Sequence, residues 1–253
     1  MVDTRFDTIV KSYEAAIAKY PSARTDDEWL LKNLDLQSTD KVLEISGGTG
    51  FLTAKMLLQV PDGKFVVQDV SSAVLEVNKS KLAEADKGRV EYYVEGNMLM
   101  PALQREYFDK VISLGGFHHF EDPLGFVKGG YQVLKDDGIL CVGDFADESP
   151  IQKYFDEVIH HITETGHFGM FMSESRMLNL ARYVGFSDIT VERTEVPFVF
   201  PDKQGIGEFF QMVHALDQEP METYKDIERL FKIEDHNDGL AVMVDYVFAK
   251  YVK

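Results

Sequence analysis

The stretch Val42-Leu43-Glu44-Ile45-Ser46-Gly47-Gly48-Thr49-Gly50 decides the fold of this chain. Its apolar start predicts a buried parallel strand, and its glycines predict a turn in which the backbone passes close to a ligand. A Gly-x-Gly after a strand is a weak signal alone, because dinucleotide-binding enzymes and plain tight turns also use it. Asp69 ends the next predicted strand, where a carboxylate accepts hydrogen bonds from both ribose hydroxyls. Together the two features predict a site for a nicotinamide or an adenosyl ligand.

Short apolar runs alternate with amphipathic helical patterns from residue 41 to residue 195. This alternation predicts an α/β fold with a doubly wound, mostly parallel, seven-stranded sheet of the Rossmann-like type. Asp122 with Pro123 predicts one helix start, while Ser173 and Gly185 predict the two ends of another helix. The last strand has no helix after it, so it is expected to pair antiparallel, at the sheet edge or between two neighbours. The predicted strands are Lys41–Ile45, Lys64–Asp69, Val90–Gly96, Phe108–Gly115, Gly138–Phe145, Ser187–Phe198 and Leu240–Tyr251.

Three regions lie outside the alternation. Residues 1–40 predict a helical N-terminal arm, and residues 149–172 and 199–239 predict helical inserts in a single domain that spans residues 41–253. The second insert is expected to hold two helices, about Gly207–Leu216 and Met221–Phe231. The first is expected to hold one amphipathic helix with an apolar stripe formed by Ile151, Tyr154, Phe155, Val158, Ile159 and Ile162. The inserts leave the sheet at the carboxyl ends of strands, where open α/β sheets bind their ligands, so they are expected to cover the site. The arm is a predicted lid in which Tyr20 or Arg24 could contact the ligand, and for Arg24 a surface position is the preferred expectation.

Composition and charge exclude several classes of protein. The chain carries 43 Asp and Glu against 26 Lys and Arg, a formal net charge of −17. This charge repels a phosphate backbone, and no basic stripe is present, so no nucleic-acid partner is expected. The single cysteine, Cys141, lies in an apolar run and is predicted to be a buried, inert thiol. No apolar run reaches the roughly 18–20 residues of a membrane helix, so a cytoplasmic protein with no membrane partner is expected.

The glycine-rich stretch and its extension to Thr53 resemble the first motif of the class I methyltransferases, which use S-adenosylmethionine (SAM). Further matches to the family follow in order along the chain, and the resemblance covers roughly residues 40 to 195. It implies SAM as the cofactor and methyl transfer as the activity. The matching segments are Val67–Ser71, Gly96–Met98, Phe108–Ser113, Phe117–Pro123 and Val133–Gly138.

The resemblance implies a cofactor site at the ends of the first four strands. Glu44 matches the acidic residue near the methionine amino group, and Asp69 matches the ribose-binding acid. Asn97 and Met98 fall where the family contacts adenine. Ser46 stands where glycine is commonest in the family, and Gln132 and Asn97 replace a common arginine and aspartate. The implied cofactor-binding residues are Glu44, Ser46, Gly47, Gly48, Gly50, Asp69, Val70, Asn97, Met98 and Leu114.

Candidate acceptor-site residues follow the fourth strand or lie in the inserts. His118 and His119 are the candidate catalytic residues, with His119 as a general base and a structural role expected for one ring of the pair. Aromatic and histidine side chains of the inserts are expected to hold an apolar acceptor, although packing of the extra helices onto the sheet explains them equally well. The predicted substrate-binding residues are His167, Phe168, Phe171, Phe209, Phe210 and His214.

No metal ion is predicted from the sequence. His160 and His161 follow Asp156 and Glu157, but only the pairs four residues apart share a helix face. Neither pair reproduces a zinc signature such as His-Glu-x-x-His, so ordinary contacts along a helix are the expected role.

The sequence therefore predicts a SAM-dependent methyltransferase whose partner is a small, largely apolar or aromatic metabolite. One alternative is a non-methylating enzyme of the same fold, such as a cyclase, that uses the cofactor structurally. A nicotinamide-dependent reductase and a non-catalytic binding module are the others. The acceptor, the atom methylated and the formation of a homodimer are left open.

Overall fold

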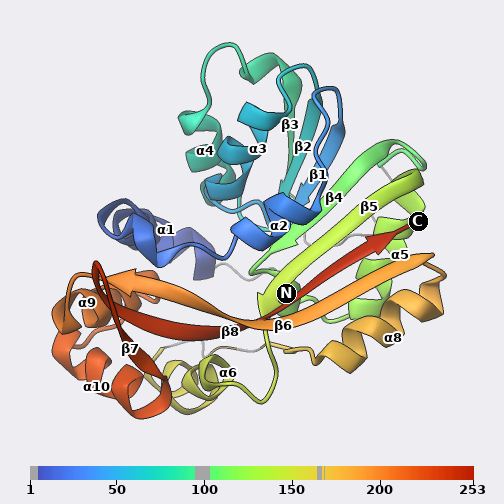
Figure 1. Ribbon diagram of the computed structural model, residues 1–253. Helices are drawn as coiled ribbons and strands as arrows, with labels where there is room; N and C mark the ends of the chain where they lie inside the picture. The colour runs from blue at the N-terminus through green and yellow to red at the C-terminus, as the bar shows by residue number, and fades with distance from the viewer. Residues whose placement is uncertain (1–4, 95–102, 164–166, 168) are drawn as a thin grey trace.

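The computed structural model describes residues 5–94, 103–163, 167 and 169–253 (Figure 1). In this part of the chain eight strands form one sheet in the order β3-β2-β1-β4-β5-β8-β6, with β7 paired to β8 alone. The order confirms the predicted doubly wound α/β fold, and β7 is one strand more than the sequence predicted. The strands are β1 (Lys41–Ile45), β2 (Lys64–Asp69), β3 (Val90–Val94), β4 (Phe108–Leu114), β5 (Leu134–Phe145), β6 (Asp188–Phe200), β7 (Ile233–His236) and β8 (Gly239–Val252).

The helices begin and end where their capping residues require. Asp122 accepts a hydrogen bond from the backbone N–H of Gly125 at 2.8 Å, and Gly185 ends another helix with φ 104°. Both ends were predicted. The helices are α1 (Arg5–Lys19), α2 (Glu28–Asn33), α3 (Phe51–Gln59), α4 (Ser72–Lys81), α5 (Pro123–Val133), α6 (Pro150–Tyr154), α7 (His160–Ile162), α8 (Glu174–Val184), α9 (Lys203–Val213) and α10 (Pro220–Leu230).

The sheet has a hydrophobic core on each face, because neighbouring residues of a strand point to opposite sides. On β1, Val42 packs with the α3 side chains Leu52 and Met56, whereas Leu43 packs with Phe126 and Val127 of α5. Figure 1 shows α5 and α8 on one side of the sheet, and α1, α9 and α10 gathered on the other.

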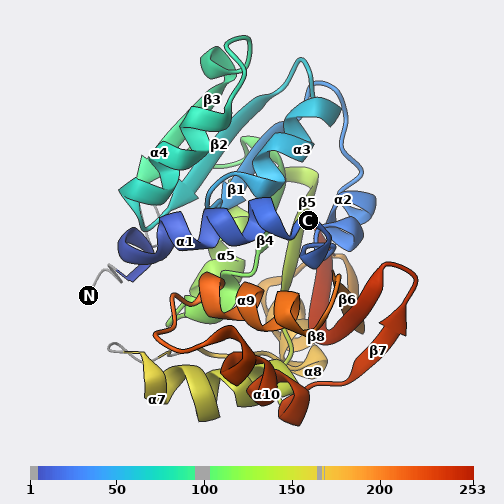
Figure 2. The ribbon, with the colours of Figure 1, turned by 90° about the vertical axis from the view of Figure 1, so that its left-hand side faces the viewer.

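The last strand, β8, lies between β5 and β6 and is antiparallel to both, which was one of the two predicted arrangements. Its pairing with β5 ends at Phe145 and Tyr246, but its pairing with β6 continues to Phe200 and Leu240. Together with β7 these strands form an antiparallel extension beyond the end of β5. The extension lies beside α9 and α10 (Figure 2).

Two predicted inserts differ in detail from the structure. Residues 199–239 contain β7 besides the two predicted helices, because Ile233–His236 pairs with β8 although it lacks an apolar strand pattern. The single amphipathic helix predicted within residues 149–172 is divided into α6, a π-helical segment at Phe155–Ile159 and α7. Five residues of its apolar stripe are buried, whereas the sixth, Ile162, is 45% exposed, because the helix ends there; the buried residues are Ile151, Tyr154, Phe155, Val158 and Ile159. Single π-helical turns occur frequently at functional sites.

The N-terminal arm places α1 between α4 and α9 (Figure 2). Lys19 Nζ and the hydroxyl of Tyr20 both contact the carboxylate of Glu208 on α9, and the Tyr20 bond measures 2.7 Å. Glu14 forms an ion pair with Lys81 of α4. Among the described helices none has both the length and the apolar character needed to cross a bilayer.

Candidate functional site

The glycine loop after β1 needs glycine for two separate reasons. Gly48 and Gly50 have φ of 56° and 89°, a left-handed backbone that side chains rarely adopt. Gly47 has no such angle, but a Cβ there would lie 2.3 Å from Cγ1 of Val67. The backbone N–H of Gly48 donates to Oδ2 of Asp69 at 3.0 Å, which fastens the loop to the end of β2.

Ser46 is the departure from the family pattern within the glycine loop, and it also has a left-handed backbone, with φ 55°. Its side chain lies against the backbone of Gly116, where a Cβ would come within 2.3 Å of the Ser46 Cβ. The loop therefore accommodates a serine because the chain after β4 supplies a glycine opposite to it.

Glu44 lies beneath the loop and is almost fully buried. Its Oε2 accepts a hydrogen bond of 2.5 Å from the hydroxyl of Thr53, and the amide of Asn78 donates to that hydroxyl at 3.0 Å. Desolvation by burial, opposed by the Thr53 hydrogen bond, raises the pKa of Glu44 to about 8. Thr53 and Asn78 were not predicted as site residues, because neither belongs to a recognisable motif.

Asp69 holds two backbone groups at the carboxyl end of β2. Its Oδ1 accepts from the N–H of Ser71 at 3.0 Å and its Oδ2 from that of Gly48. Burial raises the pKa of this carboxyl, while these hydrogen bonds oppose the rise. Asp69 and Val70 line a cavity, so the carboxylate is both fixed in place and accessible from inside.

This cavity has a volume of about 300 Å³, and its lining side chains are mostly apolar. It joins the arm, the glycine loop, the end of β4 and both inserts. Eleven of the predicted site residues line it: Ser46, Gly48, Asp69, Val70, Leu114, His118, His119, His167, Phe209, Phe210 and His214. Glu44, Gly47, Gly50 and Phe171 are not among the lining residues, and Asn97, Met98 and Phe168 lie outside the described residues.

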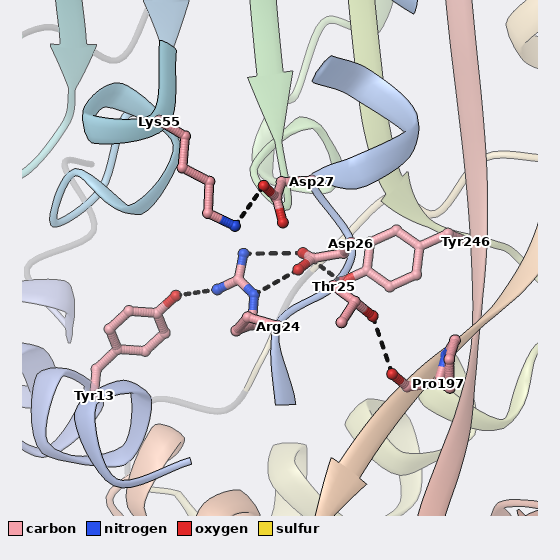
Figure 3. A network of polar contacts seen from close by, with 8 residues as sticks. All are labelled: Tyr13, Arg24, Thr25, Asp26, Asp27, Lys55, Pro197 and Tyr246. Carbon is pink, nitrogen blue, oxygen red and sulfur yellow. Dashed lines mark hydrogen bonds and ion pairs between the residues drawn. The ribbon is translucent and has the colours of Figure 1, made fainter. Parts of the chain in front are cut away.

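Arg24 is the only lysine or arginine among the described residues that line the cavity. The surface position predicted for it is wrong, because its side chain is only 13% exposed. Figure 3 shows the reason: its Nε and Nη2 donate to the two carboxylate oxygens of Asp26, at 2.8 and 2.9 Å. Its Nη1 donates to the hydroxyl of Tyr13, and the Tyr246 hydroxyl donates to Asp26 at 3.0 Å. Asp26 is close to Arg24 in the sequence, but Tyr13 and Tyr246 lie on α1 and β8, so the spacing along the chain does not reveal the whole network.

A second cation stands close to this network but is not a lining residue. Lys55 of α3 forms an ion pair of 2.6 Å with Asp27 and is 41% exposed (Figure 3). Its ammonium and the guanidinium of Arg24 both lie over the ring of Phe51, at 4.1 and 4.8 Å from the ring centre. Arg24 and Lys55 therefore contact the same aromatic ring, but only Arg24 lines the cavity.

His118 and His119 form a short turn directly after β4, at the cavity wall. Nδ1 of His118 lies 2.7 Å from Oδ1 of Asp144, and the backbone N–H of His118 donates to Oδ2 at 2.8 Å. The ring of His118 stacks on that of Phe171, with the planes at 10° and the centres 5.3 Å apart. His119 lies 4.0 Å from His118 between ring centres and is less buried.

Asp144 was not predicted as a site residue, although the sequence carries a signal for it. It follows the apolar run Ile139–Gly143 near the end of β5, as Asp69 follows the apolar run of β2. A charged residue that ends a buried strand lies at the carboxyl edge of the sheet, where ligands bind.

Residues 43–140 match the family model described as a methyltransferase domain. A ubiquinone/menaquinone biosynthesis C-methyltransferase of Proteus mirabilis is 25% identical over 167 residues, which cover 64% of this chain and 66% of that protein. The chloroplastic 2-methyl-6-phytyl-1,4-hydroquinone methyltransferase 2 of Oryza sativa is 26% identical over 191 residues, which cover 75% of this chain and 51% of that protein. The chain thus spans about half to two thirds of the length of these curated relatives.

A solved structure of phosphoethanolamine N-methyltransferase 2 from Haemonchus contortus, in complex with SAM, matches with a TM-score of 0.68. The match has 17% sequence identity and covers 98% of this chain and 57% of that chain, so it supports the fold. The family match begins within β1 and ends within β5, and it includes the glycine loop and Asp69. The match to a methyltransferase domain supports SAM, the cofactor expected from the sequence. Residues 43–140 therefore match a methyltransferase domain, and the similar proteins and structures agree with the class I SAM-dependent methyltransferase family that the glycine loop and the strand order predicted.

Proposed function

We propose that this protein transfers a methyl group from SAM to a small, largely apolar or aromatic metabolite. One observation carries the proposal: a single cavity joins the glycine loop and Asp69 to the apolar side chains of both inserts. A cofactor held on the loop and an acceptor held by the inserts would therefore meet inside the protein, away from bulk water.

The groups around the cavity fit the parts of SAM. Asp69 offers a fixed carboxylate to the ribose hydroxyls, and the loop lets the backbone approach the ligand closely. Arg24 supplies the positive charge for the cofactor's carboxylate, because only three of its five N–H donors are taken by Asp26 and Tyr13. Glu44 is assigned to the methionine amino group from beneath the loop. When bound, SAM supplies a methyl group on a positively charged sulfur.

The chain's own contribution to the transfer is mainly alignment of the two reactants. Phe209, Phe210 and Phe155 supply apolar walls for an acceptor, and His167 and His214 face the same space. His119 is assigned as the base for an acceptor hydroxyl, with His118 held in place by Asp144. The relatives named above include a hydroquinone methyltransferase, which supports an aromatic acceptor.

The deciding experiment is product analysis by mass spectrometry. The protein is incubated with SAM and a panel of apolar hydroxylated aromatic compounds, such as substituted hydroquinones. We expect S-adenosylhomocysteine and a methylated acceptor in equal amounts. An altered acceptor with SAM unconsumed would instead support the cyclase alternative. A cytoplasmic location and the division into an arm (residues 1–40) and one domain with inserts (residues 41–253) stay predictions, and the formation of a homodimer stays open.

A further inference from the structure

Three imidazole rings from two distant parts of the chain meet at one wall of the cavity. His118 and His119 follow β4, whereas His167 belongs to the first insert, and one ring nitrogen from each lies within 4.8 Å of the others. The ring centre of His167 is 5.3 Å from that of His118 and 5.2 Å from that of His119. Three imidazoles on one tetrahedral zinc ion, with Zn–N of about 2.0–2.1 Å, have ring centres about 5 Å apart. Two of the three pairs therefore have ring centres at the separation of a metal site, and the ring nitrogens, which lie within 4.8 Å of one another, would have to stand about 3.3 Å apart around the ion.

The third pair is more closely spaced. His118 and His119 are 4.0 Å apart between ring centres, so these two rings would have to separate by about 1 Å around a metal ion. Because His119 is the less buried of the two rings and lies at the end of a short turn, it is the ring with room to move.

Asp144 gives His118 the orientation of a metal ligand. A carboxylate oxygen accepts hydrogen bonds, so the contact of 2.7 Å between Oδ1 and Nδ1 places the ring proton on Nδ1. This leaves Nε2 as the ligand atom of His118. Asp144 is itself buried and accepts from the backbone N–H groups of His118 and Phe145, at 2.8 and 2.7 Å. Histidines that bind zinc commonly donate their other ring N–H to a carboxylate held in this manner.

We propose that His118, His119 and His167 form a binding site for one divalent transition-metal ion, zinc in the first place. Imidazole nitrogen is a preferred zinc ligand, and zinc with three protein ligands keeps a fourth position open. All three residues line the cavity, so the fourth position faces it. Three neutral ligands leave both positive charges of the ion in place. The open position would therefore take water or an anionic oxygen, such as an ionised hydroxyl or a carboxylate. With zinc bound, a ring nitrogen of His119 is taken, so the ion rather than His119 would favour ionisation of an acceptor hydroxyl, and His119 acts as the base only in the metal-free protein.

Metal binding can be measured without cofactor or acceptor, so this proposal and the proposed methyl transfer fail independently. The full chain is treated with a chelator, desalted and titrated with zinc sulfate against a competing chelator dye. We expect one equivalent of zinc per chain. His167→Gln should weaken the affinity at least about 100-fold, and Asp144→Asn should weaken it about 10- to 100-fold. His236→Gln is the matched control, because this exposed histidine of β7 lies outside the cavity lining, and it should bind as the wild type does.

Cobalt(II) provides a second measurement that needs no variant. In the wild-type chain we expect the intense visible absorption of a tetrahedral cobalt site with nitrogen and oxygen ligands, and zinc should abolish it. Absence of this band in the wild type overturns the proposal, whatever the variants do. Equal zinc affinity in a folded His167→Gln protein, with folding checked by circular dichroism, overturns it as well.

Discussion

Three buried carboxylates, Glu44, Asp69 and Asp144, stand at or next to the ends of β1, β2 and β5. A buried carboxylate costs free energy unless hydrogen bonds or an opposite charge compensate for its lost hydration. Asp69 and Asp144 accept two or more hydrogen bonds from the backbone, whereas Glu44 accepts from Thr53 and keeps a pKa of about 8. Glu44 is thus the carboxylate most in need of a positively charged partner, which the cofactor's amino group would provide.

The raised pKa of Glu44 predicts how pH affects stability. Its folded-state pKa of about 8 lies above the ordinary value of 4.5, with desolvation as the main cause. The contribution of this group to the free energy of unfolding is therefore full below about pH 4.5 and is lost as the pH rises through about 8. In Glu44→Gln, the midpoint of thermal unfolding should depend less on pH than it does in the wild type. Glu84→Gln changes an exposed carboxylate and should leave the pH dependence of the midpoint unchanged. An unchanged pH profile in Glu44→Gln would show that the carboxyl titrates normally in the folded protein.

His119→Gln tests the base at the wall of the cavity. The substitution removes a proton acceptor but leaves the glycine loop and Asp69 intact. Turnover of a hydroxyl acceptor should fall about 100-fold or more, while S-adenosylhomocysteine should bind with nearly unchanged affinity in calorimetry. His161→Gln serves as a control on the exposed face of α7, where no loss is expected. Normal turnover in His119→Gln would remove this histidine from the role of general base.

Among the elements, the N-terminal arm differs most from what its sequence predicts. The sequence pattern of residues 1–40 predicts helical segments and a lid, but it does not predict that Arg24 is buried. Its burial depends on Asp26 and on the Tyr246 hydroxyl, which comes from a strand 220 residues further along the chain. β7 escaped prediction for a similar reason, because its pairing with β8 rather than its own polar residues makes it a strand. Capped helices and apolar strands were predicted because the information for them is local.

Arg24→Lys tests whether the arm holds the cofactor's carboxylate. A lysine keeps the charge but loses the planar fork that Asp26 occupies, so fewer donors remain for a ligand. Binding of S-adenosylhomocysteine should weaken about 10-fold, whereas 5′-methylthioadenosine, which lacks the amino-acid part, should bind equally to both proteins. Lys55→Met is the matched control, since Lys55 shares the ring of Phe51 but does not line the cavity.

Comparing S-adenosylhomocysteine with 5′-methylthioadenosine distinguishes a lost contact to the amino-acid part from a general change in the pocket. Equal losses for both would mean that the substitution disturbs the pocket as a whole. No loss for either would remove Arg24 from the cofactor site.

At the scale of the whole molecule, the cavity exists only because the arm, the glycine loop and both inserts meet at the carboxyl edge of the sheet. The sequence predicts each of these segments and much of the loop's role, because strand, glycines and acid follow one another closely. It does not predict which side chains face one another. The pairing of His118 with Asp144 and the approach of His167 arise from the folded sheet and from the insert that packs over it.

The central claim is that this cavity binds SAM through Asp69, and calorimetry tests it most directly. Titration of the wild-type protein with S-adenosylhomocysteine should give a micromolar Kd, about −8 kcal/mol, with no comparable heat from NADH. Asp69→Ala should weaken binding by about 1–3 kcal/mol, the scale of a lost hydrogen bond to a charged group. Asp136→Ala, an exposed carboxylate of β5, should change nothing. Preferential binding of NADH, or an Asp69→Ala protein with undiminished affinity, would contradict the account.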